Sequence, residues 1–190
     1  MDSMSRINTV HINEKLRVSA YYDEFPEDPR DWDTYVSIHP LKMNGRYIPP
    51  NPGDNTNEYE IDEIYSHNDD YETAIKKHFT RLNTLCEIVD LNCDRSWIGE
   101  FVFYIEPEKV NGLSNEQKYL EATIKEYQQY TNGEVYSVAI EKLETWTNSK
   151  GDTKEIWETE DSISGIYEDV YNDETLLLIA SEYFGIEKTA

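Results

Sequence analysis

The residues with the clearest chemical potential lie between positions 21 and 33, where six carboxylates surround a single basic residue, Arg30. Pro26 and Pro29 fix the backbone angle φ and bias the preceding residues away from the helical region, so an extended or turned loop is predicted. Carboxylate oxygens on a stiff loop can bind Ca²⁺ or Mg²⁺, and acids beside aromatic rings can contact a protein. The candidate residues of this first cluster are Asp23, Glu24, Glu27, Asp28, Asp31, Trp32 and Asp33.

Two further stretches are almost free of basic residues. No Lys or Arg occurs between Tyr47 and Ile75, and none occurs between Lys154 and Lys188. The second cluster comprises Asp54, Glu58, Glu60, Asp62, Glu63, Asp69 and Asp70, and the third comprises Glu158, Glu160, Asp161, Glu168, Asp169 and Asp173. Each cluster alone is typical of a solvated face. If the fold brings them to one face, they are predicted to bind a partner, with the interleaved Tyr22, Trp32, Tyr59, Tyr65, Trp157 and Tyr167 as apolar anchors.

The net charge narrows the class of partner. The chain of 190 residues has 39 acidic and 17 basic residues, which gives a net charge of −22. Such self-repulsion opposes compaction, and it argues against direct binding to nucleic acid, which requires a basic surface. Two interpretations remain open: the charge serves solubility, or it serves a basic protein partner.

Motifs for catalysis or metal binding are weak. Gly-x-Ser-x-Gly, P-loop and Gly-x-Gly-x-x-Gly patterns are absent from the sequence, and 39 acids make chance carboxylate pairs uninformative. A calcium loop that would begin at Asp90 has Arg95 where Gly is needed and Phe101 where a bidentate Glu is needed. Cys86 and Cys93 match no zinc spacing. We therefore predict no enzyme, no cofactor and no metal. The alternative is a small metal-dependent enzyme or ligand-binding protein that uses the carboxylates of residues 23–33.

The pattern of apolar residues predicts an α+β fold. Strands are expected at 16–22, 35–39, 97–105, 134–147 and 153–158, with a bulge near residues 141–142 and a turn at 148–152. Helices are expected from Asn68 or Asp69 to Val89, from a Ser114 cap to residue 132, and over 175–184 with Tyr183 on the core side. The predicted architecture is one mostly antiparallel sheet with about three packed helices. It forms a single domain over 16–190 after a polar leader at 1–15.

Three sequence blocks carry a resemblance to a known family. Residues 23–33 read Asp-x-x-Pro-x-x-Pro-Arg-x-Trp-Asp, which resembles the opening block of a family of small acidic proteins from phages and mobile elements. Residues 97–105 resemble that family's Gly-containing core strand, and residues 126–136 resemble its Tyr-x-x-Tyr-x-x-Gly-x-Val-Tyr block. The chain departs after Asp33, where Thr34 and Tyr35 replace the usual Asn-Leu-Gly. The family is mostly uncharacterised, so the resemblance implies a phage context and supplies no catalytic residues.

Charge and resemblance together predict a phage-encoded inhibitor of a host nucleic-acid-targeting defence enzyme, either anti-CRISPR or anti-restriction. Duplex DNA has one negative charge per roughly 1.7 Å of its axis, and folded carboxylates can imitate that spacing in a basic groove. The expected partner is a host nuclease or CRISPR effector in the host cytoplasm, with no nucleic acid or membrane bound directly. The oligomeric state stays open, a homodimer included. An accessory or structural phage protein is a further alternative.

Overall fold

The computed structural model describes residues 5–32, 34–43, 46–47, 71–93, 97–106 and 115–186. The chain divides into two compact units: unit 1 comprises residues 1–27 and 133–190, and unit 2 comprises residues 28–132. Each unit contains a four-stranded antiparallel sheet, and three α-helices are described, which confirms the α+β class. The residue pattern predicts one sheet in one domain over 16–190, whereas the described residues form two sheets. Part of the expected polar leader is also a strand, β1 (Arg6–Asn13).

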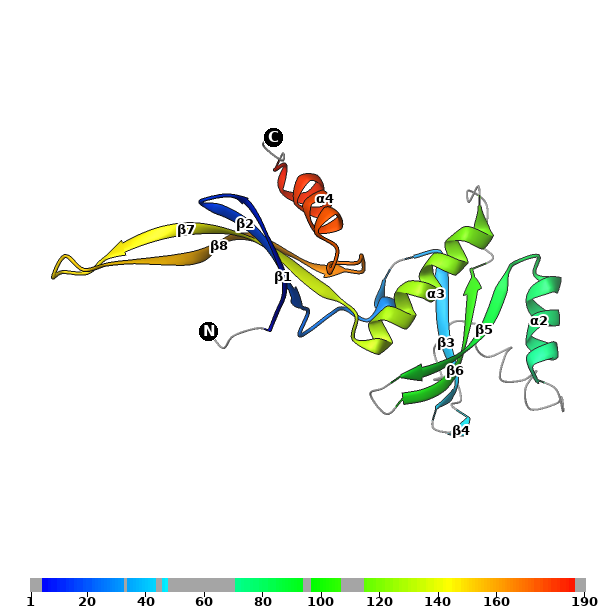
Figure 1. Cartoon of the computed structure of the whole chain (residues 1–190). Helices are drawn as coiled ribbons and strands as arrows, with labels where there is room; N and C mark the ends of the chain where they lie inside the picture. The colour runs from blue at the N-terminus through cyan, green and yellow to red at the C-terminus, as the bar shows by residue number, and fades with distance from the viewer. Residues whose placement is uncertain are drawn as a thin grey trace. The chain divides into compact units, whose positions relative to one another are not determined.

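Unit 1 is a sheet with one helix on one face. Its strands are β1, β2 (Leu16–Tyr22), β7 (Tyr136–Thr147) and β8 (Thr153–Ile166), in the order β1-β2-β7-β8. Helix α4 (Asp173–Phe184) lies against this sheet (Figure 1). Because side chains alternate across a strand, β2 and β7 each direct every second residue toward α4. The resulting core contains Val18, Ala20, Val138, Ile140, Ile166, Leu176, Ile179 and Ala180.

The β7–β8 hairpin confirms the predicted turn at 148–152, although β8 extends further than expected, to Ile166. The register shifts between Ile140 and Glu141, close to the bulge predicted near residues 141–142, but the prediction names the wrong strand. The extra residue is Glu160 in β8, because Ile140 is opposite Asp161 and Glu141 is opposite Thr159. Strand β7 therefore keeps its alternation, and Leu143 shares the face of Glu141.

Helix α4 begins two residues earlier than predicted. The side chain of Asn172 caps it by accepting hydrogen bonds from the backbone N–H groups of Glu174 (2.8 Å) and Thr175 (3.4 Å). Gly185 ends it at φ 65°, a left-handed conformation that suits glycine. The prediction that Tyr183 lies on the core side is wrong: 52% of its surface is exposed, and Phe184 packs on the core instead.

Removing the Asn172 cap should destabilise unit 1. Asn172→Ala leaves the first N–H groups of α4 without their side-chain acceptor, so we expect the free energy of unfolding to fall by about 1 kcal/mol. Urea denaturation followed by circular dichroism measures this loss. Asn172→Asp keeps an acceptor at the same place and should remain close to the parent; equal losses in both variants would contradict a capping role.

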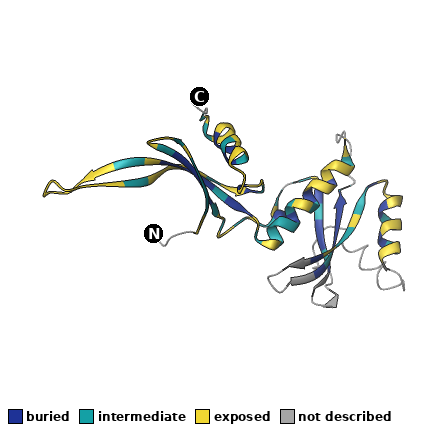
Figure 2. Cartoon of the chain, in the orientation of Figure 1, coloured by how far each residue is buried: buried dark blue, intermediate teal, exposed yellow. Residues whose placement is uncertain are grey.

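Unit 2 is a sheet with helices on both faces. Its strands are β3 (Val36–Met43), β4 (Arg46–Tyr47), β5 (Cys86–Cys93) and β6 (Trp97–Ile105), in the order β4-β3-β6-β5. Helix α3 (Glu116–Asn132) packs on Phe101, Phe103 and Ile105, and α2 (Tyr71–Arg81) packs on Val102 and Tyr104. Central β6 is thus buried on both faces, as its dark segment in Figure 2 shows, and this explains its continuous apolar run.

The predicted helix from residue 68 or 69 to Val89 is wrong beyond Arg81. Asn83 adopts φ 55°, and the chain then forms β5, which pairs along β6 from Cys86 to Cys93. Both faces of β5 contact apolar residues, so consecutive positions are apolar and imitate helical spacing. Cys86 lies in this strand, where burial raises the pKa of its thiol to about 11.

The sequence prediction for α3 can be compared with the structure at the C-terminal end of the helix but not at its predicted cap. The predicted cap, Ser114, lies outside the described residues, and the side chain of Asn115 accepts a hydrogen bond from the N–H of Lys118 at 3.3 Å. The helix ends at Asn132, and Gly133 follows at φ 73°, which confirms the predicted stop. Among the helices described, none is both long and apolar enough to cross a membrane.

Candidate functional site

The predicted partner-binding residues fall into three groups. Those of unit 1 are Asp23, Glu24, Glu27, Glu158, Glu160, Asp161, Glu168, Asp169 and Asp173, whereas Asp28, Asp31 and Trp32 belong to unit 2. Asp33 and the whole second cluster (Asp54, Glu58, Glu60, Asp62, Glu63, Asp69 and Asp70) lie outside the described residues. The first cluster is therefore divided between the units, and its first part shares unit 1 with the third cluster.

Hydrogen bonds connect the beginning of the first cluster, at residues 22–23, with residues 165–171 in the third cluster. The carboxylate of Asp23 accepts a hydrogen bond from the N–H of Gly165 at 3.2 Å. The hydroxyl groups of Tyr22 and Tyr171 are 2.9 Å apart and share a hydrogen bond. In the sheet, Tyr22 pairs with Tyr136, which in turn pairs with Ile166. Residues 22–25 and 165–171 therefore meet at one end of the sheet of unit 1.

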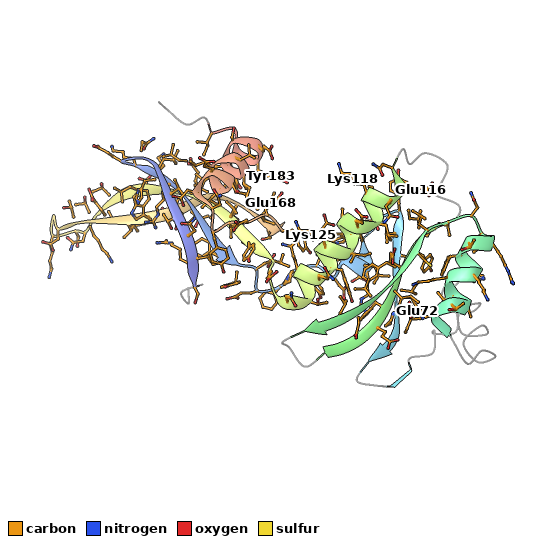
Figure 3. The ribbon with its side chains drawn as sticks, turned by 45° about the vertical axis from the view of Figure 1, so that its right-hand side comes forward. Glu72, Glu116, Lys118, Lys125, Glu168 and Tyr183 are labelled. Atoms are coloured by element: carbon orange, nitrogen blue, oxygen red, sulfur yellow. The ribbon has the colours of Figure 1, made fainter. Side chains whose placement is uncertain are left out.

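At this end of the unit 1 sheet, aromatic rings are exposed among acidic residues. We define the acidic–aromatic surface as Tyr22, Glu24, Phe25, Glu168, Asp169 and Tyr171. The exposed fractions of its rings are 88% for Phe25, 58% for Tyr171 and 45% for Tyr22. All three acids are also exposed, and Figure 3 shows Glu168 beyond the end of β8. Exposed aromatic groups in a charged rim are the composition expected of a protein-binding surface.

Tyr171 of this surface is held as a neutral hydrogen-bonding group. The hydrogen bond with Tyr22, followed by partial burial and the nearby Tyr136, raises the pKa of Tyr171 well above its usual value. The ring of Tyr136 lies edge-on to Tyr171 at 6.1 Å between centroids, and it is tilted against Tyr22 at 5.8 Å. This three-ring cluster fixes the positions of the Tyr22 and Tyr171 rings, so a partner would meet these two rings already in place.

The acids of unit 2 have a different environment. The Arg30 guanidinium Nε donates to both oxygens of Asp28 at 3.0 Å, and the N–H of Arg30 donates to the same carboxylate at 2.9 Å. Burial alone would raise the pKa of Asp28, but the hydrogen bonds from Arg30 outweigh it and lower the pKa. Asp28 thus caps the short 3₁₀ helix η1 (Pro29–Asp31), and the positive charge of Arg30 balances its negative charge within the loop.

The β8 acids lie further along the hairpin. Glu158, Glu160 and Asp161 are all exposed, and Glu158 accepts a hydrogen bond from the indole N–H of Trp146 at 3.0 Å. Asp161 pairs with Ile140, whereas the acidic–aromatic surface begins beside Tyr136. These three acids extend the negative charge of unit 1 and do not belong to the surface itself.

The metal-binding alternative requires a cluster of ligands, and the part of the chain that is described contains none. Within those residues, no three His, Cys, Asp or Glu side chains are grouped so as to hold an ion. Asp23 accepts backbone hydrogen bonds from Phe25 and Gly165, and Asp28 is paired with Arg30. Asp33, the last carboxylate of that loop, lies outside the described residues.

A buried ionic network that was not predicted from the sequence lies on the other face of the unit 1 sheet. Glu141 is only 4% exposed, and one of its oxygens accepts hydrogen bonds from Arg17 Nε (2.8 Å) and the Ser19 hydroxyl. Its other oxygen accepts from the Tyr21 hydroxyl (2.9 Å) and from Arg6 Nη2 (3.1 Å). Burial would raise the pKa of Glu141, but the hydrogen bonds from Arg17, Ser19 and Tyr21 and the charge of Arg6 lower it.

An aromatic ring completes this network. The guanidinium of Arg17 lies 4.2 Å from the ring centroid of Trp157, a cation–π contact, and His11 meets the edge of the same ring. One sequence signal could have revealed it: Arg17 is the only charged residue of strand β2, which implies a buried acidic partner. Nothing local identifies Glu141 as that partner among 39 acids.

Comparison with known proteins gives no relative: no family model, curated protein or solved structure matches this chain. The resemblance of residues 23–33, 97–105 and 126–136 to acidic phage proteins therefore stays a prediction from those blocks alone.

Proposed function

We propose that this protein is a non-catalytic inhibitor that binds a basic, nucleic-acid-binding protein and occupies its groove. The observation that carries the proposal is the acidic–aromatic surface, where Tyr22, Phe25 and Tyr171 are exposed among Glu24, Glu168 and Asp169. A mobile tail of acids would suffice for solubility. Rings fixed by hydrogen bonds and ring contacts between distant segments are better suited to a specific contact.

Two physical effects would contribute to binding: charge would speed association, and apolar contact would slow dissociation. Unit 1 contains 19 acidic and 7 basic residues, a net charge of −12, which would steer it toward a positive groove and raise the association rate. The exposed rings would then bury apolar area against the partner and slow dissociation. No bond is made or broken in this mechanism, so it needs neither a cofactor nor a catalytic residue.

The partner we propose is a host nuclease or CRISPR effector, with the protein supplied by a phage and acting in the host cytoplasm. The negative charge and the sequence blocks at 23–33, 97–105 and 126–136 support this choice. An accessory or structural phage protein, and a metal-dependent enzyme or ligand binder, are the competing functions. A rise in the melting temperature on adding Ca²⁺ or Mg²⁺, reversed by a chelator, would favour the metal-dependent function.

Affinity capture from host lysate tests the proposal. We expect the immobilised protein to retain one nuclease or defence complex at low salt and to release it either at high salt or on adding duplex DNA. DNA competition is the sharper test, because salt releases any ionic complex whereas DNA releases only a partner held through its nucleic-acid groove. Capture of a protein that DNA does not displace, or of nothing at low salt, would contradict the proposal.

A further inference from the structure

The two edges of the unit 1 sheet differ in charge. Edge strand β8 carries Glu155, Glu158, Glu160 and Asp161, and like charges of this kind discourage pairing with another chain. The opposite edge, β1, has the sequence Arg-Ile-Asn-Thr-Val-His-Ile-Asn and contains no acid. Among the described strands, β1 pairs with β2 alone. The two edges of this sheet therefore differ: four acids lie on β8 and none on β1.

An apolar cleft lies beside this edge. It has a volume of about 350 Å³, and it is lined by Ile12 at the end of β1 and by residues from α4 and just beyond it. Those residues are Glu174, Leu177, Leu178, Ala180, Ser181 and Ile186. Leu178 is 57% exposed, which is high for a leucine in a helix whose other leucines pack on the core. The cleft and the edge strand together offer backbone hydrogen bonds and apolar area to one added strand.

We propose that β1 pairs antiparallel with β1 of a second copy of this chain, which joins the two sheets into one of eight strands. In such a pair the two-fold axis is perpendicular to the sheet, so both α4 helices lie on the same face and both clefts border the contact. The side of β1 that carries Ile7 and Val10 already packs on the core, and the pair would continue this apolar layer across the axis.

Charge selects the second copy as the partner. Two chains of net charge −22 repel each other least where acids are few, and of the two edge strands of this sheet only β1 contains no acid. A basic partner would be drawn to β8 or to the acidic–aromatic surface instead of an edge that contains Arg6 and no acid. Screening reduces repulsion between the copies, so dimerisation should strengthen with salt, whereas binding to a basic protein should weaken.

Light scattering combined with size-exclusion chromatography tests the dimer. We expect a mass twice the 22.3 kDa of one chain at high protein concentration, with a larger dimer fraction at about 1 M salt, where the Debye length is about 3 Å. Leu178→Glu replaces an apolar side chain with a second carboxylate in each cleft, beside Glu174, and should weaken dimerisation at least about tenfold. Tyr119→Glu, at an exposed residue of α3 in unit 2 (39% exposed, against 57% for Leu178), should leave the dimer intact.

Hydrogen exchange locates the contact. The β1 amides should exchange more slowly as the protein concentration rises, and this protection should be absent in Leu178→Glu. A monomer at every concentration and salt, or a dimer that Leu178→Glu leaves unchanged, would overturn the inference. The opposite salt dependences keep this result separate from the proposed inhibitor function, since either can fail while the other holds.

Discussion

Glu141→Gln is expected to lower the free energy of unfolding at pH 7 by about 3 kcal/mol, the lower end of the range for breaking a buried ion pair. Glutamine keeps the size of the side chain, but it leaves the guanidinium of Arg17, itself only 8% exposed, without an opposing charge. The lower end applies because Arg6 is exposed enough for water to replace part of its interaction.

The effect of Glu141 should depend on pH in a defined direction. The folded protein lowers the pKa of Glu141 below its ordinary value of 4.5, so the folded state favours the ionised form. Its contribution to stability is complete above pH 4.5 and is lost as the pH falls toward the lower pKa of the folded state. The difference between the parent and Glu141→Gln should therefore be constant near neutral pH and shrink below pH 4.5.

Urea denaturation at several pH values measures this difference. Glu144→Gln on the same strand is the matched control, because the side chain of Glu144 is 46% exposed, against 6% for Glu141, and its ion pair with Lys142 spans 3.8 Å. Its effect should be within about 0.5 kcal/mol at every pH. If Glu141→Gln costs no more than Glu144→Gln, the buried network does not stabilise unit 1.

Neutralising the acidic–aromatic surface is expected to reduce partner binding more than neutralising the same number of acids elsewhere. The triple variant Glu24→Gln, Glu168→Gln and Asp169→Asn should lower the association rate constant about tenfold or more, because it weakens steering at the contact itself. The asparagine can still accept the hydrogen bond that Asp169 receives from the N–H of Tyr171, so the local turn is kept.

A control with the same net charge makes this test specific. Glu87→Gln, Asp90→Asn and Glu121→Gln remove three exposed acids of unit 2 and change the total charge equally. Surface plasmon resonance against the captured partner should find the control close to the parent. Equal losses in both triple variants would show that net charge alone governs binding and that this surface is not the contact.

Phe25→Ala should instead raise the dissociation rate constant, since it removes an anchor and no charge.

The sequence predicted elements well where a single local pattern was unambiguous. The apolar run of β6, the turn after β7 and the Gly133 stop of α3 were all read from neighbouring residues, and the structure confirms each of them. Strand β5 was mistaken for a helix because burial on both faces gives apolar residues at helical spacing. Local periodicity identifies strands without showing which strands pair, so the division into two sheets was not foreseen.

In the candidate sites too, local sequence features were predictable, whereas contacts between residues far apart in the sequence were not. The sequence by itself determined the charge of −22, the clusters almost free of bases and the aromatic residues among them. Only the tertiary structure joined Tyr22 to Tyr171 and Arg17 to Glu141, pairs separated by 149 and 124 residues. It also divided residues 23–33 between two units. Strand pairing decides such contacts, and it depends on packing over the whole sheet, which no local pattern of residue types records.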